Sequence, residues 1–246
     1  MQADKRIDYI KNWISEYCKS MPKEADSLVV GISGGIDSSV TSTLCALTGK
    51  RTIVLSMPIR QIKEQHDLSI GHQKWLKKKF KNVDSYLINL DLLFETFKNS
   101  LSKFDNEHGM ANARARLRMT TLYQVAAANN GIVVGTGNKV EDFGVGFYTK
   151  YGDGGVDISP LADCTKTQVW EMGEKLGILE GIVKADPTDG LWEDGRADVS
   201  QLGMSYQDLE KAMIDSNNPG HKKYLEIRKK NLHKMNPIPV CKMKND

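Results

Sequence analysis

The chain has 246 residues, of which 40% are hydrophobic and 26% charged, and 34 basic residues against 31 acidic ones leave a net charge of +3. This composition excludes a disordered or fibrous chain, and no apolar run reaches the roughly 20 residues that a membrane span needs. A charge so close to balance gives no reason to expect a nucleic-acid partner.

The N-terminal segment and the cysteines bear on the compartment. Residues 1–17 carry charges from position 4 onward and lack the apolar stretch of a secretory signal peptide. The four cysteines are scattered and form no CxxC pair, so a zinc or redox site of that type is not expected. We therefore expect a cytoplasmic protein with reduced thiols.

The predicted elements follow from the spacing of apolar residues. Residues 5–18 place Ile7, Ile10 and Ile14 on one face and predict an amphipathic helix. The apolar run 28–32 leads into a glycine-rich turn and predicts a buried parallel strand. The later predicted elements are a helix over 38–48, a strand over 52–57, a helix over 63–80, a strand over 85–90, a helix over 91–101, a long helix over 110–130, a strand over 131–135, and helices near 165–176, 205–214 and 221–233.

The order of these elements predicts the fold class. Strands and helices alternate, and the strands are short and apolar, which favours one α/β domain with a doubly wound parallel sheet. We expect ligands to bind beyond the carboxyl ends of the strands. Residues 144–155 and 186–203 are rich in Gly and Asp and are predicted as long loops, which in compact domains are usually functional or disordered.

The most informative stretch runs from Gly31 to Ser39 and reads Gly-Ile-Ser-Gly-Gly-Ile-Asp-Ser-Ser. Its glycines allow a tight turn and a close approach to an anion. The free N–H groups at the start of the following helix favour a phosphate at the same place. The stretch has neither the Gly-Lys-Ser/Thr of a Walker loop nor the GxGxxG of a dinucleotide fold.

Asp37 is the unusual residue of this stretch, because a carboxylate beside phosphates is repelled unless a cation lies between them. Mg²⁺ is commonly held by one or two carboxylates together with substrate phosphates. Glu141 and Asp142, six and seven residues beyond the strand that ends at Gly135, supply a second carboxylate. The alternative is an ordinary turn in which Asp37 caps the helix.

The string SGGIDSS resembles the pyrophosphate loop of the N-type ATP pyrophosphatases, which cleave ATP between its α- and β-phosphates to adenylate a substrate. Three further stretches narrow the resemblance to NAD synthetase, from about residue 5 to residue 240. They are NARARLRM from Asn112, GTGNKVEDFGVGFYTKYGDGGVD from Gly135, and PTDGLWEDGRADVSQLGMSY from Pro187. Between Gly135 and Glu141 the chain reads Thr-Gly-Asn-Lys-Val, where many bacterial members have Thr-Asp-His-Ala-Ala.

The resemblance implies an adenine nucleotide α-hydrolase-like, Rossmann-like fold and the last step of NAD biosynthesis. In that reaction deamido-NAD, ATP and ammonia give NAD, AMP and pyrophosphate through an adenylated carboxylate. Mg²⁺ is the implied cofactor and ATP the co-substrate. The implied partners are small molecules and a second copy in a homodimer, with no nucleic acid and no membrane.

The resemblance also implies roles for individual residues. It assigns Mg²⁺ to Asp37 and Glu141, and catalysis to Lys166, as an electrostatic group, and to Asp153, as a proton acceptor for ammonium. The implied ATP contacts are Gly31, Ile32, Ser33, Gly34, Gly35, Ile36, Asp37, Ser38, Thr136, Lys166 and Thr188. The implied deamido-NAD contacts are Arg116, Lys150, Asp157, His233 and Lys234. We expect Asp37 in a solvent-facing loop, where its replacement by Ala affects activity more than folding.

The predicted organisation is a single NAD synthetase domain over residues 1–246. It comprises an N-terminal helix in 1–26, a nucleotide-binding α/β core in 27–180, a mobile loop at 186–203, and C-terminal helices with a basic tail in 204–246. Only about 26 residues precede the first strand, which leaves no room for an amidohydrolase domain, so we expect free ammonia or a separate glutaminase subunit. Two other hypotheses are an enzyme that adenylates a tRNA base and a non-catalytic module that senses ATP.

Overall fold

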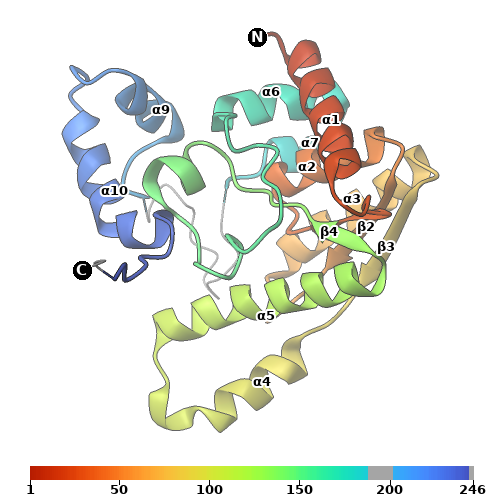
Figure 1. Ribbon diagram of the computed structural model, residues 1–246, viewed down its shortest axis with the longest axis horizontal. Helices are drawn as coiled ribbons and strands as arrows, with labels where there is room; N and C mark the ends of the chain where they lie inside the picture. The colour runs from red at the N-terminus through yellow and green to blue at the C-terminus, as the bar shows by residue number, and fades with distance from the viewer. Residues whose placement is uncertain (188–201, 244–246) are drawn as a thin grey trace.

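The computed structural model describes residues 1–187 and 202–243. Its centre is a parallel sheet of four strands in the order β3-β2-β1-β4 (Figure 1). The strands are β1 (Ser27–Gly31), β2 (Arg51–Ser56), β3 (Val83–Leu87) and β4 (Gly131–Val133). Within the central pair, Val29 lies opposite Ile53 and Gly31 opposite Leu55, so both strands end at the same edge.

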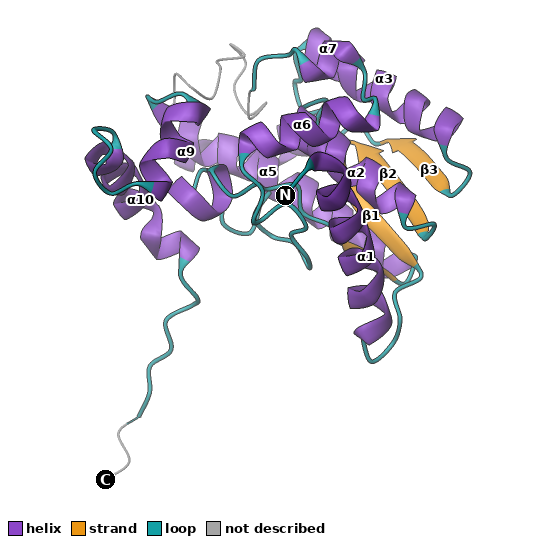
Figure 2. Cartoon of the chain, turned by 90° about the horizontal axis from the view of Figure 1, so that it is seen from above, coloured by secondary structure: helices purple, strands orange, loops and turns teal. Residues whose placement is uncertain are grey.

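Helices cover both faces of the sheet, as a doubly wound fold requires (Figures 1 and 2). Leu28 and Val30 of β1 and Val54 of β2 pack under α1 (Ala3–Ser20), α2 (Ile36–Leu47), α3 (Lys63–Lys79), α6 (Lys166–Leu176) and α7 (Glu180–Val183). Val29 and the alternate residues Ile53 and Leu55 pack on α4 (Asp91–Ser100) and α5 (Glu107–Ala128). The two-residue alternation of a strand therefore builds two cores from one sheet.

A third apolar cluster lies beyond the end of the sheet. It joins Val140 and Val145 to Tyr206 and Leu209 of α9 (Tyr206–Ile214) and to Tyr224 of α10 (His221–Met235). Both helices stand to one side of the sheet, and the segment that follows β4 lies beside α10 (Figure 1).

The predicted fold class is confirmed, and most elements lie within two or three residues of their predicted bounds. The strand predicted over 85–90 is displaced toward the N-terminus, because β3 pairs from Val83 opposite Thr52 to Leu87 opposite Ser56. It is an edge strand with Leu87 54% exposed, so its apolar residues did not mark its bounds.

The expected loop over 144–155 contains some helical structure. Residues Glu141–Val145 form a π-helical turn, which also holds the proposed metal ligand Glu141. A short 3₁₀ turn spans Ser102–Phe104, and α7 was not predicted. Residues 188–201, most of the predicted 186–203 loop, lie outside the described residues. Among the residues described, no helix is both long and apolar enough to cross a membrane.

Candidate active site

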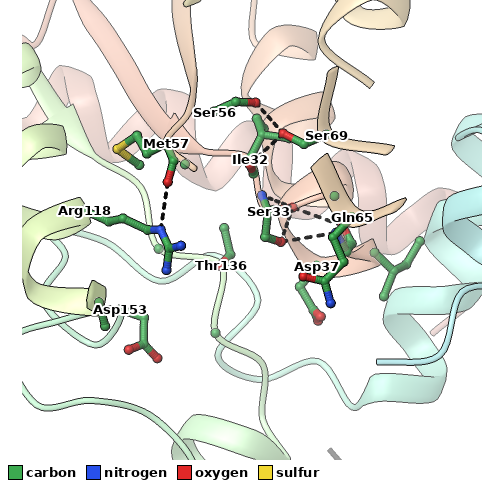
Figure 3. A pocket seen from close by; sticks show the side chains of 18 of the residues that line it. Ile32, Ser33, Asp37, Ser56, Met57, Gln65, Ser69, Arg118, Thr136 and Asp153 are labelled. Atoms are coloured by element: carbon green, nitrogen blue, oxygen red, sulfur yellow. Dashed lines mark hydrogen bonds between the residues drawn. The ribbon is translucent and has the colours of Figure 1, made fainter. Parts of the chain in front are cut away.

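A cavity of about 280 Å³ lies at the carboxyl edge of the sheet (Figure 3). Three segments at the carboxyl ends of strands line it: residues 31–38 from the last residue of β1, residues 56–58 from the last residue of β2, and residues 134–137 after β4. In Figure 3, Ser33 and Asp37 lie on one side, Arg118 and Asp153 on the other, and Thr136 between them. Open parallel sheets bind ligands at this edge, so the cavity lies where the sequence predicts.

The glycine-rich turn is closed by bonds among its own residues. Ser33 N donates to Ser38 Oγ at 3.3 Å, and Gly35 N donates to Ser33 Oγ at 3.2 Å. Gly34 has φ +96°, and a Cβ there would lie 2.6 Å from the carbonyl oxygen of Gln65, so only glycine fits. The N-terminus of α2 therefore borders the cavity in a fixed geometry suited to an anion.

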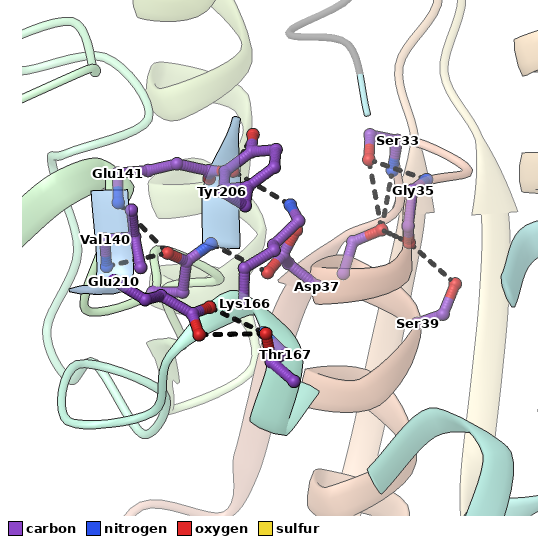
Figure 4. Close-up of polar contacts among 12 residues, drawn as sticks. Ser33, Gly35, Asp37, Ser39, Val140, Glu141, Lys166, Thr167, Tyr206 and Glu210 are labelled. Atoms are coloured by element: carbon purple, nitrogen blue, oxygen red, sulfur yellow. Dashed lines mark hydrogen bonds and ion pairs between the residues drawn. The ribbon is translucent and has the colours of Figure 1, made fainter. Parts of the chain in front are cut away.

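Lys166 joins the two predicted metal ligands (Figure 4). Its Nζ lies 2.6 Å from Asp37 Oδ2 and 2.8 Å from Glu141 Oε1. The side chain of Lys166 is only 2% exposed, and those of Asp37 and Glu141 are 17% and 14% exposed. Asp37 therefore does not lie in a solvent-facing loop, as expected from sequence, but is mostly buried in the first turn of α2.

Two polar side chains hold the carboxylates from the other side. Asn138 Nδ2 donates to Asp37 Oδ1 at 3.0 Å, and the hydroxyl of Tyr206 donates to Glu141 Oε1 at 2.5 Å. Gly35 is the N-cap of α2, and it has no side-chain cap bond. The alternative in which Asp37 acts only as a helix cap is therefore wrong.

The pKa values of the cluster reflect burial and pairing. Burial acts to lower the pKa of Lys166, but the charges of Asp37 and Glu141 outweigh it and raise that pKa overall. Burial raises the pKa of Asp37, and the charge of Glu141 adds to this. Burial also acts to raise the pKa of Glu141, but Lys166, Tyr206 and Asn138 lower it overall. The ammonium of Lys166 is therefore charged at neutral pH.

The carboxylate pair has the chemistry of a partial magnesium site. No group of three or more His, Cys, Asp or Glu that could hold a metal ion occurs in residues 1–187 and 202–243. Mg²⁺ does not need such a cage, because it binds through one or two carboxylates and keeps phosphate oxygens and waters as its other ligands. Asp37 and Glu141 converge on one point and fit that donor set.

Hydrogen bonds at the start of α6 fix the position of Lys166. Thr165 and Gln168 form a capping box, in which Thr165 N donates to Gln168 Oε1 at 3.1 Å. The backbone N and the hydroxyl of Thr167 each donate at 2.8 Å to the carboxylate of Glu210 on α9 (Figure 4). Lys166 is the first residue of this anchored helix, which places its side chain over the carboxylate pair.

Two further carboxylates, Asp142 and Asp153, line the cavity. Asp153 Oδ1 accepts a hydrogen bond of 3.0 Å from the backbone N of Thr149. Burial, followed by the charges of Asp153 and Glu141, raises the pKa of Asp142 well above its usual value. A Cβ at Gly137 would lie 2.1 Å from Asp142 Oδ2, so the absent side chain at position 137 makes room for this carboxylate.

The C-terminal helix holds the segment that carries these acids. Arg228 of α10 donates to the carbonyl oxygens of Phe143 and Gly144. Asn231 Nδ2 donates to Val145 O at 2.9 Å, and Lys234 Nζ donates to Tyr148 O at 2.6 Å. These three donors, which we call the α10 clamp, are spaced three residues apart on one side of the helix.

The predicted ATP contacts meet in the cavity. Residues 31–38, Thr136 and Lys166 all line it, as do the predicted metal ligand Glu141 and the predicted proton acceptor Asp153. Thr188 lies outside the described residues.

The predicted deamido-NAD contacts do not line the cavity. Arg116 and His233 are exposed, and Arg116 Nε donates to Lys150 O at 3.3 Å. Asp157 accepts bonds from Tyr123 OH at 3.0 Å and from the backbone N of Val133 at 2.7 Å. Their assignment to the substrate stays a prediction.

Arg118 is a cavity residue that the sequence did not single out. Its Nε donates to Met57 O at 3.0 Å, and its Nη2 donates to Gln61 Oε1 at 3.1 Å. Arg114, Arg116 and Arg118 alternate along α5, and only the rotation of the helix decides which of them borders the cavity. The resemblance implied Arg116, which is exposed, rather than Arg118.

Known proteins resemble this chain over most of its length. A profile of the family described as NAD synthase matches residues 6–245. The chain belongs to the NAD synthase family. An NH(3)-dependent NAD(+) synthetase of Carboxydothermus hydrogenoformans is 35% identical over 86% of this chain and 85% of the relative. A second, from Finegoldia magna, is 36% identical over 95% of this chain and 94% of the relative.

Two solved structures share the fold of this chain. The structure of NMN synthetase from Francisella tularensis has a TM-score of 0.89 and 30% identity, covering 99% of this chain and 100% of that one. An NAD+ synthetase from Burkholderia pseudomallei has a TM-score of 0.76 and 25% identity, covering 95% of this chain and 90% of that one.

Proposed function

We propose that this protein is an ammonia-dependent NAD synthetase that converts deamido-NAD, ATP and ammonia to NAD, AMP and pyrophosphate. The observation that carries the proposal is the buried cluster of Asp37, Glu141 and Lys166 beside the glycine-rich turn. A site for ATP sensing alone does not require two carboxylates and a lysine that converge beside the phosphate turn. Membership of the NAD synthase family supports the same conclusion.

In the first half-reaction the nicotinate carboxylate attacks the α-phosphorus of ATP, and pyrophosphate leaves. The turn at 31–38 and the N-terminus of α2 bind the phosphates. Asp37 and Glu141 would hold Mg²⁺, which supplies charge neutralisation on the phosphate oxygens. Lys166, and Arg118 across the cavity, add positive charge where negative charge develops.

In the second half-reaction ammonia attacks the adenylated carboxylate, and AMP leaves. Ammonia is nucleophilic only without its extra proton, so a carboxylate close to the reacting carbon is needed to accept that proton. Asp153 is the proposed acceptor, because it lines the cavity and its carboxylate is oriented by Thr149.

Several finer assignments belong to the same proposal. Arg116, Lys150, Asp157, His233 and Lys234 would contact the parts of deamido-NAD that extend beyond the cavity, and Thr188 would contact ATP. We propose a homodimer in the cytoplasm, with ammonia taken from solution or from a separate glutaminase.

The test is an assay of the purified protein with deamido-NAD, ATP, Mg²⁺ and either ammonium or glutamine, with NAD and AMP measured separately. We expect both products with ammonium and neither with glutamine. AMP without NAD would favour an enzyme that adenylates another acceptor, including a tRNA base. Neither product would favour a nucleotide sensor.

A second candidate function is amidation of nicotinate mononucleotide to NMN. The observation that favours it is the TM-score of 0.89 with the Francisella NMN synthetase, against 0.76 for the Burkholderia NAD+ synthetase. The reacting carboxylate is the same in both substrates, so the described cavity serves either. Measuring kcat/KM for both substrates decides between them, and preference for the mononucleotide would replace deamido-NAD as the substrate.

A further inference from the structure

We propose that Lys166 is the resident cation of the nucleotide-free site: its ammonium holds Asp37 and Glu141 together and is exchanged for the divalent cation that arrives with ATP. The inference rests on the proposed function, because it takes Mg²⁺ and ATP as the ligands. It adds a second role to a residue so far assigned only to phosphate.

The distances carry the first step. One nitrogen lies 2.6 Å from Asp37 Oδ2 and 2.8 Å from Glu141 Oε1, so it occupies the point on which both carboxylates converge. Mg²⁺ binds carboxylate oxygens at about 2.0–2.1 Å and would need that same point. The ammonium and the divalent cation therefore exclude each other between this pair.

Burial carries the second step. The Lys166 side chain is 2% exposed, so water does little to screen the ion pairs that it makes. Two buried carboxylates without a counter-ion repel each other strongly. A cation between them removes this repulsion without protonating either carboxylate, and in the nucleotide-free protein Lys166 provides that cation.

The remaining contacts explain how the exchange leaves the metal ligands in place. Asp37 keeps the amide of Asn138 and Glu141 keeps the hydroxyl of Tyr206 when the ammonium leaves. Lys166 begins α6, which the Thr167–Glu210 bonds anchor, so only its flexible side chain needs to move. The phosphates of ATP, bound at the adjacent turn, attract the released ammonium.

Two consequences follow for the protein without nucleotide. A divalent cation alone competes with a tethered ammonium and binds weakly. Replacing Lys166 by Met removes the competitor and one positive charge, and we expect Mn²⁺, used as a spectroscopic substitute for Mg²⁺, to bind about tenfold or more tightly.

The experiment measures Mn²⁺ binding by electron paramagnetic resonance, and the thermal midpoint with and without Mg²⁺, in the absence of ATP. We expect a Mg²⁺-dependent rise in the midpoint for Lys166→Met and none for the wild type. Lys139→Met is the matched control, because it removes a lysine whose partner, Asp163, is 94% exposed and lies outside the cluster. The double variant Lys166→Met, Asp37→Asn should show neither the tighter Mn²⁺ binding nor the Mg²⁺-dependent rise in the midpoint.

Equal Mn²⁺ affinity in the wild type and Lys166→Met would overturn the inference. If Lys166→Met folds poorly, the wild type alone decides: Mn²⁺ affinity without nucleotide equal to that with a non-hydrolysable ATP analogue would also overturn it. The product assay of the wild type tests the proposed function separately. NAD formation without the metal gain would refute only the exchange, and the gain without NAD formation would refute only the activity.

Discussion

The carboxylate of Asp37 carries a negative charge at the site, and hydrogen bonds from Lys166 and Asn138 fix its position. The sequence predicted that it would meet Glu141, since the carboxyl ends of parallel strands share one edge of the sheet. It did not predict that Lys166 would lie between them. That position depends on where α6 packs against α2, and no short sequence motif predicts the packing of two helices that are far apart in the chain. The same limit explains why Arg118 was not singled out.

We expect Asp37→Asn to lower kcat/KM by about 100-fold or more, because it removes one negative charge from the proposed Mg²⁺ ligands. The amide keeps the shape of the side chain, so the thermal midpoint should fall less than in Asp37→Ala. Steady-state kinetics and calorimetry on both variants check this. A wild-type rate in Asp37→Asn would show that the charge of Asp37 has no role in catalysis.

Gly137→Ala tests the position of Asp142. The added Cβ would lie 2.1 Å from Asp142 Oδ2, so the carboxylate must turn away from its present place. We expect amide formation to fall by about tenfold, because Asp142 lies close enough to Asp153, the proposed proton acceptor, for their charges to interact. Exchange of pyrophosphate into ATP should stay within a factor of two or three, because the phosphate turn is untouched.

The control for Gly137→Ala is Gly71→Ala in α3, whose Cβ would meet Leu179 at an ordinary 3.5 Å. A loss of both half-reactions in Gly137→Ala would show that the turn, rather than Asp142, had moved.

At the scale of elements, the contact between α2 and α3 contains a buried histidine. His72 has no exposed surface, and its Nε2 lies 3.0 Å from Ser42 Oγ. Burial lowers its pKa to about 4. The unfolded chain takes up this proton near pH 6.5, so stability is complete above that pH and is lost as the pH falls from about 6.5 to about 4.

We expect this histidine to lower the free energy of unfolding by about 2 kcal/mol between pH 7 and pH 5. Urea unfolding of the wild type and His72→Gln at both pH values checks this. The variant should have a lower free energy of unfolding than the wild type at pH 7, but that free energy should fall less between pH 7 and pH 5. An equal loss in both proteins would assign the pH dependence to other groups.

The α10 clamp is a second contact between elements, and it holds the segment from Phe143 to Tyr148 against α10. The sequence predicted the helix but assigned its last turn to the substrate, whereas Lys234 donates to Tyr148 O. Arg228→Met removes two bonds to the segment that carries Asp142 and leads to Asp153. We expect amide formation to slow by about tenfold, with little change in the KM for ATP.

Lys229→Met and Lys230→Met are matched controls for the clamp, because both lysines are exposed on the same helix. Both should keep wild-type kinetics. An increase in the KM for ATP equal to the loss of rate in Arg228→Met would indicate a general loosening of the cavity.

At the scale of the whole molecule, α1 and α4 are among the elements that expose large apolar side chains. On α1, Tyr9, Trp13 and Tyr17 are spaced four residues apart and are 64%, 37% and 38% exposed. On α4, Leu92 and Leu93 are 81% and 49% exposed. The sequence predicted the sheet and its covered faces from periodicity, but exposure of this kind depends on the finished packing.

We expect light scattering to report a dimer, because exposed apolar surfaces of this kind mark interfaces. Trp13→Glu and Leu92→Glu introduce a charge on one surface each, so the variant that yields a monomer identifies the interface. A wild type that is monomeric at micromolar concentration would contradict the proposed homodimer.

The clustered side chains come from distant parts of the chain, since Asp37, Glu141, Lys166 and Tyr206 span 170 positions. During synthesis the strands and both covering layers emerge first, and α9 and α10 come after them. A growing chain adds roughly 5–20 residues each second, so for several seconds the sheet is present while the hydroxyl of Tyr206 and the α10 clamp are absent. The candidate site is therefore completed last, because Glu141 gains the hydroxyl of Tyr206 only after residue 206 has been added, and the 141–148 segment gains the α10 clamp only after residue 234.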